Sequence, residues 1–251
     1  MRVLFASYGN DSIALIQFAA EQGWPDVTVL HTDTGWAAPG WKPRVEIAEE
    51  WVLSLGFKAA RTTGETMEQL VERKKAWPRG GGGRFQFCTE ALKEAPAVAW
   101  LAEHDPEGEA ICLVGIRREE SANRTNWPEW TPDSPKHGGR DLYAPLVRHT
   151  ELMRNELIAQ TPMPIIAGRS KECYPCVNAN KGELKWLDEP NIIRVERIEG
   201  KMGVNSKGNA RVMFSPRRHG GAIGIRAVVA DSQHDTGLLF EAGCDSGWCG
   251  S

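Results

Sequence analysis

The sequence lacks several features that define large classes of proteins. No apolar run approaches the roughly 20 residues of a membrane-spanning helix. The formal net charge of −3 speaks against a surface that attracts nucleic acid over its whole extent, although it leaves room for a local basic patch. The N-terminus has one arginine and a short apolar run without a small-residue cleavage site, which does not fit a secretory signal peptide. We therefore expect a cytoplasmic protein.

Cysteines are scarce as well. Six of them in 251 residues are too few for a secreted disulfide scaffold. Cys112 lies in the apolar run 110–114, which predicts a buried strand in which a free thiol packs as a small hydrophobic group. The other five lie in polar or turn-rich segments and call for a chemical explanation: Cys88, Cys173, Cys176, Cys244 and Cys249.

Strand and helix patterns alternate through the first two thirds of the chain. Apolar runs predict strands at 2–6, 27–31, 58–61 and 110–115, and apolar residues at helical spacing predict helices at 12–22, 44–55, 66–75 and 89–104. This alternation predicts an α/β fold with a doubly wound, mostly parallel sheet between two layers of helices, as in Rossmann-like folds.

Two stretches break this alternation. The four glycines at 80–83 predict a surface loop or a mobile flap beside an active site. After about Pro190 helical periodicity fades while glycine, arginine and lysine accumulate. We therefore expect a nucleotide-binding domain at 1–187 and a small, basic, cysteine-containing segment at 188–251 that wraps on it.

The turn Ser7-Tyr8-Gly9-Asn10-Asp11-Ser12 leaves the first predicted strand, where ligands of open α/β sheets bind. Its glycine lets the backbone approach an anion, and the amides that open the next helix point toward that anion. The turn lacks the Gly-Lys-Ser/Thr of a Walker A motif and is not G-x-G-x-x-G. Taken alone, it could equally be a tight turn in which Ser12 caps the helix.

This turn resembles the PP-loop, S-G-G-x-D-S, of the adenine nucleotide alpha-hydrolase superfamily. Four further segments resemble, in order, motifs of its phosphoadenosine phosphosulfate (PAPS) reductase branch: H-T-D-T-G-W at 31–36, F-C-T-E-A-L-K-E-A-P at 87–96, G-I-R-R-E-E-S-A-N-R at 115–124 and C-Y-P-C at 173–176. The resemblance covers about residues 1–187. It departs where Tyr8 replaces a loop glycine and where the Glu-Cys-Gly-x-His tail of the reductases is absent.

The resemblance implies an enzyme that binds ATP, adenylyl sulfate or PAPS. The expected contacts to phosphate or sulfate oxygens are backbone amides and hydroxyls of Ser7, Gly9, Asn10 and Ser12. Asp11 is expected to bridge through Mg²⁺ or to brace the loop with a hydrogen bond. Asp33 and Thr34 are expected near the nucleotide, with a turn-capping role for Asp33 as the alternative.

Cations are expected to meet the phosphates, because arginine forks and lysine ammonium groups bind phosphate oxygens. The candidates are Lys93, Arg117 and Arg124. For Arg118, Glu119 and Glu120 we expect a solvated charged turn.

A lone Cys-x-x-Cys allows a redox dithiol, half of a zinc site or half of an iron–sulfur site. Relatives that reduce adenylyl sulfate hold a 4Fe–4S cluster with a tandem Cys-Cys at the position of Phe87-Cys88 and a later Cys-x-x-Cys. The resemblance thus implies Cys88, Cys173 and Cys176 as ligands here. Cys244 is expected as the fourth ligand and Cys249 as a catalytic thiol, although the sequence leaves their order open, and a structural zinc is the alternative.

Three functions fit these expectations. A sulfonucleotide reductase would attack the sulfur of adenylyl sulfate or PAPS with a C-terminal thiolate. An ATP pyrophosphatase would adenylate an acceptor for sulfur insertion, as in DNA phosphorothioation or tRNA thiolation, with nucleic acid held by the region 207–226 and sulfur brought by a donor protein. The third function is a nucleotide-binding module without catalysis. Acceptor, sulfur donor and oligomeric state do not follow from the sequence.

Overall fold

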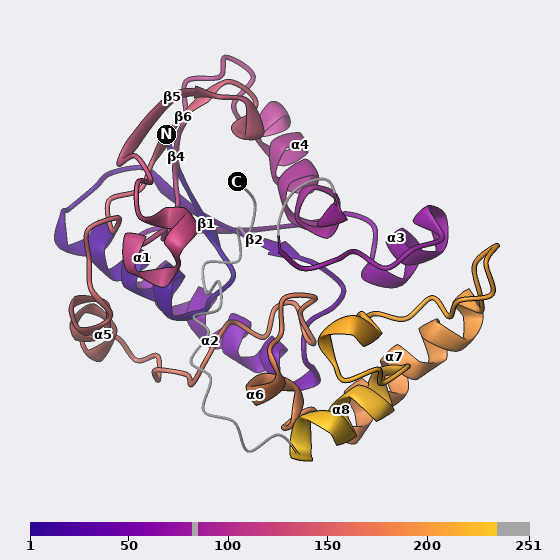
Figure 1. The fold of residues 1–251 in the computed structure, drawn as a ribbon. Helices are drawn as coiled ribbons and strands as arrows, with labels where there is room; N and C mark the ends of the chain where they lie inside the picture. Colours follow the sequence, from indigo (N-terminus) through magenta and orange to yellow (C-terminus); the bar gives the residue numbers. More distant parts are fainter. Residues whose placement is uncertain (82–84, 235–251) are drawn as a thin grey trace.

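The computed structural model describes residues 1–81 and 85–234, and within them a single six-stranded sheet in the order β3-β2-β1-β4-β6-β5 (Figure 1). Every strand pairs in parallel except β5, which pairs antiparallel with β6 at the edge. The strands are β1 (Arg2–Ala6), β2 (Val27–Asp33), β3 (Lys58–Thr63), β4 (Ile111–Leu113), β5 (Trp130–Ser134) and β6 (Arg140–Tyr143). The predicted α/β fold with a mostly parallel sheet is confirmed.

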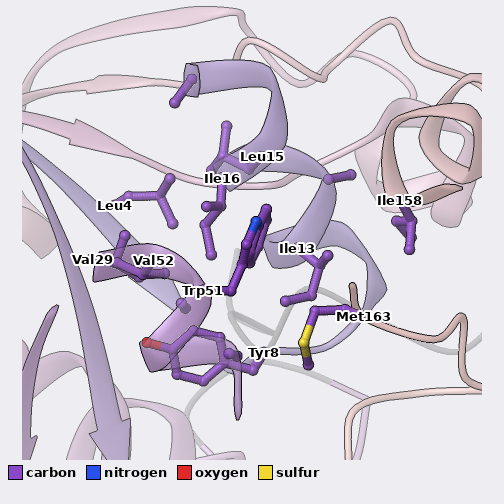
Figure 2. Close-up of a cluster of buried hydrophobic side chains, with 14 of the residues drawn as sticks. Leu4, Tyr8, Ile13, Leu15, Ile16, Val29, Trp51, Val52, Ile158 and Met163 are labelled. Carbon is purple, nitrogen blue, oxygen red and sulfur yellow. The ribbon is translucent and has the colours of Figure 1, made fainter. Parts of the chain in front are cut away.

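Helices cover both faces of the sheet. Successive residues of β1 point to opposite faces, so Leu4 packs on one side and Val3 on the other. The first side carries α1 (Asn10–Glu21), α2 (Lys42–Ser54) and α5 (Glu151–Ala159), and the second carries α4 (Ala95–His104). Figure 2 shows the core of the first side, where Trp51 of α2 lies beside Ile16 of α1.

The predicted helix at 89–104 begins with a π-helical turn, η3 (Glu90–Glu94), and continues as α4. Helix α3 (Met67–Lys74) begins with a capping box in which Thr66 and Gln69 satisfy each other's backbone amides. The short 3₁₀ turns are η1 (Pro39–Trp41), η4 (Arg118–Glu120), η5 (Ala122–Arg124), η6 (Pro135–His137) and η7 (Pro216–Arg218).

The expectation that helical periodicity fades after Pro190 is wrong. After the short α6 (Lys181–Leu184), the chain forms α7 (Glu189–Met202) and α8 (Ile225–His234). Helix α7 buries Ile192, Val195 and Ile198, whose spacing of three residues makes one apolar stripe between charged positions. The helices α7 and α8 lie side by side, away from β4, β5 and β6 (Figure 1).

Helices α7 and α8 share a core of their own with parts of the main domain. Val195 of α7 and Val228 of α8 pack in one cluster with Leu70 of α3 and Leu184 of α6. Cys88 belongs to the same cluster, so this core reaches the segment that leads into α4. None of the described helices is long and apolar enough to cross a membrane.

Candidate nucleotide and thiol site

The predicted PP-loop connects β1 to α1 at the carboxyl end of β1. Tyr8 has a left-handed backbone, with a φ of 55°, and its ring is fully buried beside His31. Gly9 is the residue that precedes the helix, and its backbone is extended. Ser12 does not cap α1, because its Oγ donates to the Gly9 carbonyl at 3.0 Å. No side chain caps α1, so its first amides lack a capping acceptor, which is the condition for an anion seat at a helix N-terminus.

Asp11 braces the loop from within. Its side chain is fully buried, and its Oδ1 accepts a hydrogen bond from Arg117 Nε at 2.6 Å. Arg154 of α5 lies 3.9 Å from the same oxygen. Two guanidinium groups around one carboxylate repel a further cation, so this geometry favours the bracing role over a Mg²⁺ bridge.

The sequence analysis missed Arg154. It is 4% exposed and lies three and four residues before the buried Leu157 and Ile158, on the apolar face of α5. An arginine on the apolar stripe of a helix is the signal that could have found it, because a buried charge requires a partner.

One later segment, the 166–173 connector, lies against the loop. Asn10 Nδ2 donates to the Ile166 carbonyl at 2.8 Å, and the Ile166 amide donates to Asn10 Oδ1 at 3.1 Å. A Cβ on Gly9 would be 2.9 Å from Ser170 Cβ, and Ser170 Oγ donates to the Ser7 carbonyl at 3.4 Å. The side chain of Asn10 is therefore occupied by protein, and only its backbone amide is left for a ligand.

At the end of β2, Asp33 and Thr34 both contact protein groups. Asp33 Oδ1 accepts from the Gly35 amide at 2.8 Å, which is the turn-capping role considered for it. Thr34 is buried, and its Oγ1 donates to the Glu172 carbonyl at 2.7 Å. Thr34 also lines the pocket described below.

Glu172, in the connector, was not predicted as a site residue. Its Oε2 lies 3.3 Å from His31 Nε2, and His31 Nδ1 lies 2.9 Å from the Ala6 carbonyl just before the loop. Burial lowers the pKa of His31, but the hydrogen bond and charge of Glu172 outweigh it and raise that pKa overall. A buried carboxylate thus ties the end of β2 to the connector.

The segment after β4 is less exposed than expected. Glu120 is buried and forms ion pairs with Arg117, at 3.9 Å, and with Arg124, so the prediction of a solvated charged turn is wrong for this residue. Both arginines need a carboxylate once they are buried, and Glu120 lies three residues after Arg117 and four residues before Arg124. Glu119 is exposed and lies 3.1 Å from Arg117.

Three of the cysteines line one pocket, which we call the thiol pocket. Cys88 comes from the segment that leads into α4, whereas Cys173 and Cys176 come from the connector and the turn after it. Lys93 lies on η3, one helical turn beyond Cys88. The complete lining is Thr34, Gln86, Cys88, Thr89, Leu92, Lys93, Cys173, Cys176, Val177 and Asn178.

The environment of the pocket favours one thiolate. A hydrogen bond from Cys173 lowers the pKa of Cys176 against the opposing effect of burial, and Arg169, the Asn178 amide and Lys93 lower it further. The same hydrogen bond and burial raise the pKa of Cys173. Burial also raises the pKa of Cys88 to about 11. Of the three cysteines that line the pocket, Cys176 is the one whose pKa is lowered.

Cys88, Cys173 and Cys176 supply three of the four thiolates that an iron–sulfur cluster takes, and all three line the thiol pocket. Within residues 1–81 and 85–234, no group of three His, Cys, Asp or Glu side chains is arranged to hold a metal ion. The choice between a 4Fe–4S cluster and a zinc ion stays a prediction. Cys244 and Cys249 lie outside the described residues.

Cys112, outside this pocket, is the core thiol expected from its apolar run. It is fully buried in the sheet core opposite α4, and burial raises its pKa to about 12.

Several basic side chains of the region 207–226 contact protein groups. Arg226 pairs with Glu189 at 2.6 Å and with Glu196 at 2.8 Å. Arg211 Nη1 donates to the Met202 carbonyl at 3.0 Å, and His219 is buried beside Phe214. A nucleic-acid partner for this region stays a prediction.

Comparisons with known proteins agree with the motifs. A sequence model of the phosphoadenosine phosphosulfate reductase domain matches residues 2–168. A search of curated protein sequences gave no significant match.

Similar solved structures include PAPS reductase from Candida auris in a phosphate complex, with 13% identity, a TM-score of 0.43, and coverage of 66% of this chain and 75% of that one. NMN synthetase from Francisella tularensis has 15% identity and a TM-score of 0.46 over 95% of this chain and 87% of that one. FMN adenylyltransferase from Candida glabrata has 11% identity and a TM-score of 0.38 over 65% and 48%. Because the domain model covers well over half of the sequence, the chain belongs to the phosphoadenosine phosphosulfate reductase family.

Proposed function

We propose that this protein is an adenine-nucleotide-dependent enzyme of sulfur metabolism or sulfur transfer in the cytoplasm, with an iron–sulfur cluster in the thiol pocket. The observation that carries the proposal is that Cys88, Cys173 and Cys176 line one pocket together with Lys93. Thiols that serve only as core residues need no cation and no shared cavity. Cys112 is the example of such a thiol in this chain.

The nucleotide binds at the PP-loop in this proposal. The Gly9 backbone and the first amides of α1 hold phosphate or sulfate oxygens of ATP, adenylyl sulfate or PAPS. Arg117 acts indirectly, because its guanidinium is bound to Asp11 and sets the shape of the loop. Lys93 is the cation of the thiol pocket that could meet a charged group of the substrate.

The cluster is held by Cys88, Cys173 and Cys176, with Cys244 from the segment 188–251 as the fourth ligand. When bound, a 4Fe–4S cluster supplies iron for electron transfer or for Lewis-acid chemistry. Thr89 and Leu92 close the pocket around the sulfurs and keep water away from them.

In the favoured reaction, the Cys249 thiolate attacks the sulfur of adenylyl sulfate or PAPS. A bond forms between the two sulfurs, the bond from sulfur to the phosphate oxygen breaks, and the nucleotide leaves with the electron pair. An external dithiol then attacks Cys249, which releases sulfite, and the dithiol is oxidised to a disulfide. In the alternative, an acceptor oxygen attacks the α-phosphate of ATP and pyrophosphate leaves.

An anaerobic turnover comparison tests the proposal. ATP, adenylyl sulfate and PAPS are supplied in separate reactions with a thiol donor, with and without DNA or RNA, and both sulfite and pyrophosphate are measured. We expect sulfite from a sulfonucleotide, and its loss in Cys249→Ser but not in Cys112→Ala. Pyrophosphate from ATP would instead favour the adenylating enzyme. Absence of both products would favour a nucleotide-binding module.

A further inference from the structure

The thiol turn, residues 173–176, is joined by hydrogen bonds to the segment that follows β2. The Tyr174 amide donates to the Trp36 carbonyl at 2.8 Å. The indole Nε1 of Trp36 donates to the Pro175 carbonyl, 139 positions away in the sequence, at 3.0 Å. The Trp36 side chain is buried. One tryptophan thus contacts the turn through its backbone carbonyl and through its ring nitrogen.

Both of these stretches carry lining residues of the thiol pocket. Thr34 lies two positions before Trp36, and Cys173 and Cys176 are the two ends of the turn. A side chain at the end of a short turn follows the backbone of that turn. The seating of the turn on Trp36 therefore decides where the two sulfurs lie, and a group that fixes this seating acts on the pocket without lining it.

Arg194 of α7 is such a group. Its Cζ lies 3.9 Å from the centre of the Trp36 ring, so the guanidinium packs against the indole as a cation–π pair. Nη1 donates to the Ala37 carbonyl at 3.1 Å, and Nη2 donates to the carbonyls of Trp36, at 3.4 Å, and of Tyr174. One side chain thus binds both stretches at once, which the planar fork of an arginine permits and the single ammonium of a lysine does not.

A simpler role for Arg194 would be to anchor α7 on the rest of the domain. Arg197, one turn further along the same helix, shows what such an anchor looks like, because it forms an ion pair with Glu68 of α3. Within residues 1–81 and 85–234 no carboxylate forms an ion pair with Arg194, and its acceptors are three backbone carbonyls. Those carbonyls belong to the two stretches that meet at the thiol pocket, which points to a role in the site.

We propose that Arg194 is a positioning residue of the thiol pocket, which clamps the thiol turn onto Trp36 and thereby sets where the sulfurs of Cys173 and Cys176 lie. The proposal rests on the proposed function for what these sulfurs do, but the position of the turn can be measured without turnover and without a bound metal. It makes α7 a part of the site, although α7 lies beyond the segment 2–168 that matches the family model.

Alkylation of the full-length, metal-free protein by iodoacetamide tests this role. The folded protein is labelled at fixed pH under anaerobic, reducing conditions, and the labelling rate of each cysteine is followed by mass spectrometry of its peptides. The variants are Arg194→Gln, which removes the charge and the fork, and Arg194→Lys, which keeps the charge. Arg197→Gln is the matched control, because Arg197 lies on the same helix but pairs with Glu68. Cys112, fully buried in the sheet core, reports any opening of the whole domain.

We expect Cys173 and Cys176 to be alkylated about tenfold faster in Arg194→Gln than in the wild type, because a hydrogen bond from a charged donor typically contributes about one power of ten to such a closing equilibrium. Arg194→Lys should give rates between those of the wild type and Arg194→Gln. Arg197→Gln should label as the wild type does, and Cys112 should stay protected in every variant.

Unchanged rates at Cys173 and Cys176 in Arg194→Gln would overturn the role of Arg194. Equal acceleration at Cys112 would overturn it too, because Arg194 would then stabilise the whole domain and not the turn. If Arg194→Gln does not fold, wild-type rates in Arg194→Lys would overturn it, since the fork would not be needed. A wild type that binds no iron would refute the proposed cluster and leave the alkylation result standing.

Discussion

Arg117 and Asp11 lie 106 residues apart in the sequence and meet in a buried ion pair, with 2.6 Å between Nε and Oδ1. Removal of one partner from such a pair leaves an uncompensated buried charge, which typically costs 3–5 kcal/mol. We expect Asp11→Asn to lower the free energy of unfolding by about 3 kcal/mol, at the lower end of this range because Arg117 keeps two glutamates nearby.

Denaturant unfolding measures this loss, and an exposed ion pair provides the comparison. Glu189 is 55% exposed and pairs with Arg226, so Glu189→Gln should cost much less than Asp11→Asn, because water screens an exposed ion pair. Equal losses for Asp11→Asn and Glu189→Gln would show that the loop does not depend on its buried pair.

The contact between Gly9 and Ser170 predicts a second effect. Gly9 has a φ of −75°, so alanine fits its backbone, but the added Cβ would lie 2.9 Å from Ser170 Cβ. We expect Gly9→Ala to destabilise the protein by about 1–3 kcal/mol through overpacking and Ser170→Gly to restore part of this loss in the double variant.

Denaturant unfolding of the wild type, the two single variants and the double variant gives the coupling energy between residues 9 and 170. Gly40→Ala serves as the control, because a Cβ there meets no atom within 4 Å. Additive effects of Gly9→Ala and Ser170→Gly would mean that the connector does not pack on the loop as described.

Tyr8 carries a hydroxyl that has no hydrogen-bond partner in the described part of the chain, although its ring is fully buried. A buried polar group without a partner costs about 1–3 kcal/mol. We therefore expect Tyr8→Phe to raise the free energy of unfolding by about 1 kcal/mol, whereas Tyr8→Ala should lower it by about 3–5 kcal/mol. A clear loss of stability in Tyr8→Phe, measured by thermal unfolding, would speak against this burial.

His137 makes stability depend on pH. Burial lowers its pKa from 6.5 to about 4, and its Nδ1 lies 2.8 Å from Ser134 Oγ. A histidine with a lowered pKa in the folded protein stabilises it fully above pH 6.5, and this contribution is lost as the pH falls from 6.5 toward 4. The loss amounts to about 3 kcal/mol for a difference of this size.

Denaturant unfolding between pH 4 and 7 isolates this effect when the wild type is compared with His137→Gln. Because the carboxylates titrate alike in both proteins, the difference between the two curves reports His137. We expect the variant to lose about 3 kcal/mol less over this range. Parallel curves would mean that His137 is not held neutral by burial.

The part of the fold that sequence predicts well is the part with strong local patterns. The strand at 2–6 consists almost entirely of apolar residues, and the helix that follows it is rich in them. Both elements form as expected. Strands β5 and β6 were missed because β5 reads Trp-Thr-Pro-Asp-Ser, an edge strand with exposed polar positions and no alternating apolar face. Helix α7 was missed because its apolar stripe is narrow and surrounded by charge.

Among the residues of the candidate site, too, those with a local sequence pattern could be predicted and those without one could not. Ser7, Asp11 and the cysteines could be selected because each lies in a short motif. Arg154 and Glu172 belong to no motif, and they matter through contacts with residues 143 and 138 positions away in the sequence. Such partners follow from burial, which forces each charge to find a counter-charge, and burial is known only once the chain is folded.

The most direct measurement is the iron and sulfide content of the full-length protein purified without oxygen, compared between the wild type, Cys88→Ala and Cys112→Ala. Cys88 lines the thiol pocket, whereas Cys112 is an equally buried cysteine of the sheet core. The account predicts a brown wild type and a brown Cys112→Ala with the same iron content, and a clear loss of iron in Cys88→Ala. A colourless wild type that contains zinc, or a Cys88→Ala variant with undiminished iron, would contradict it.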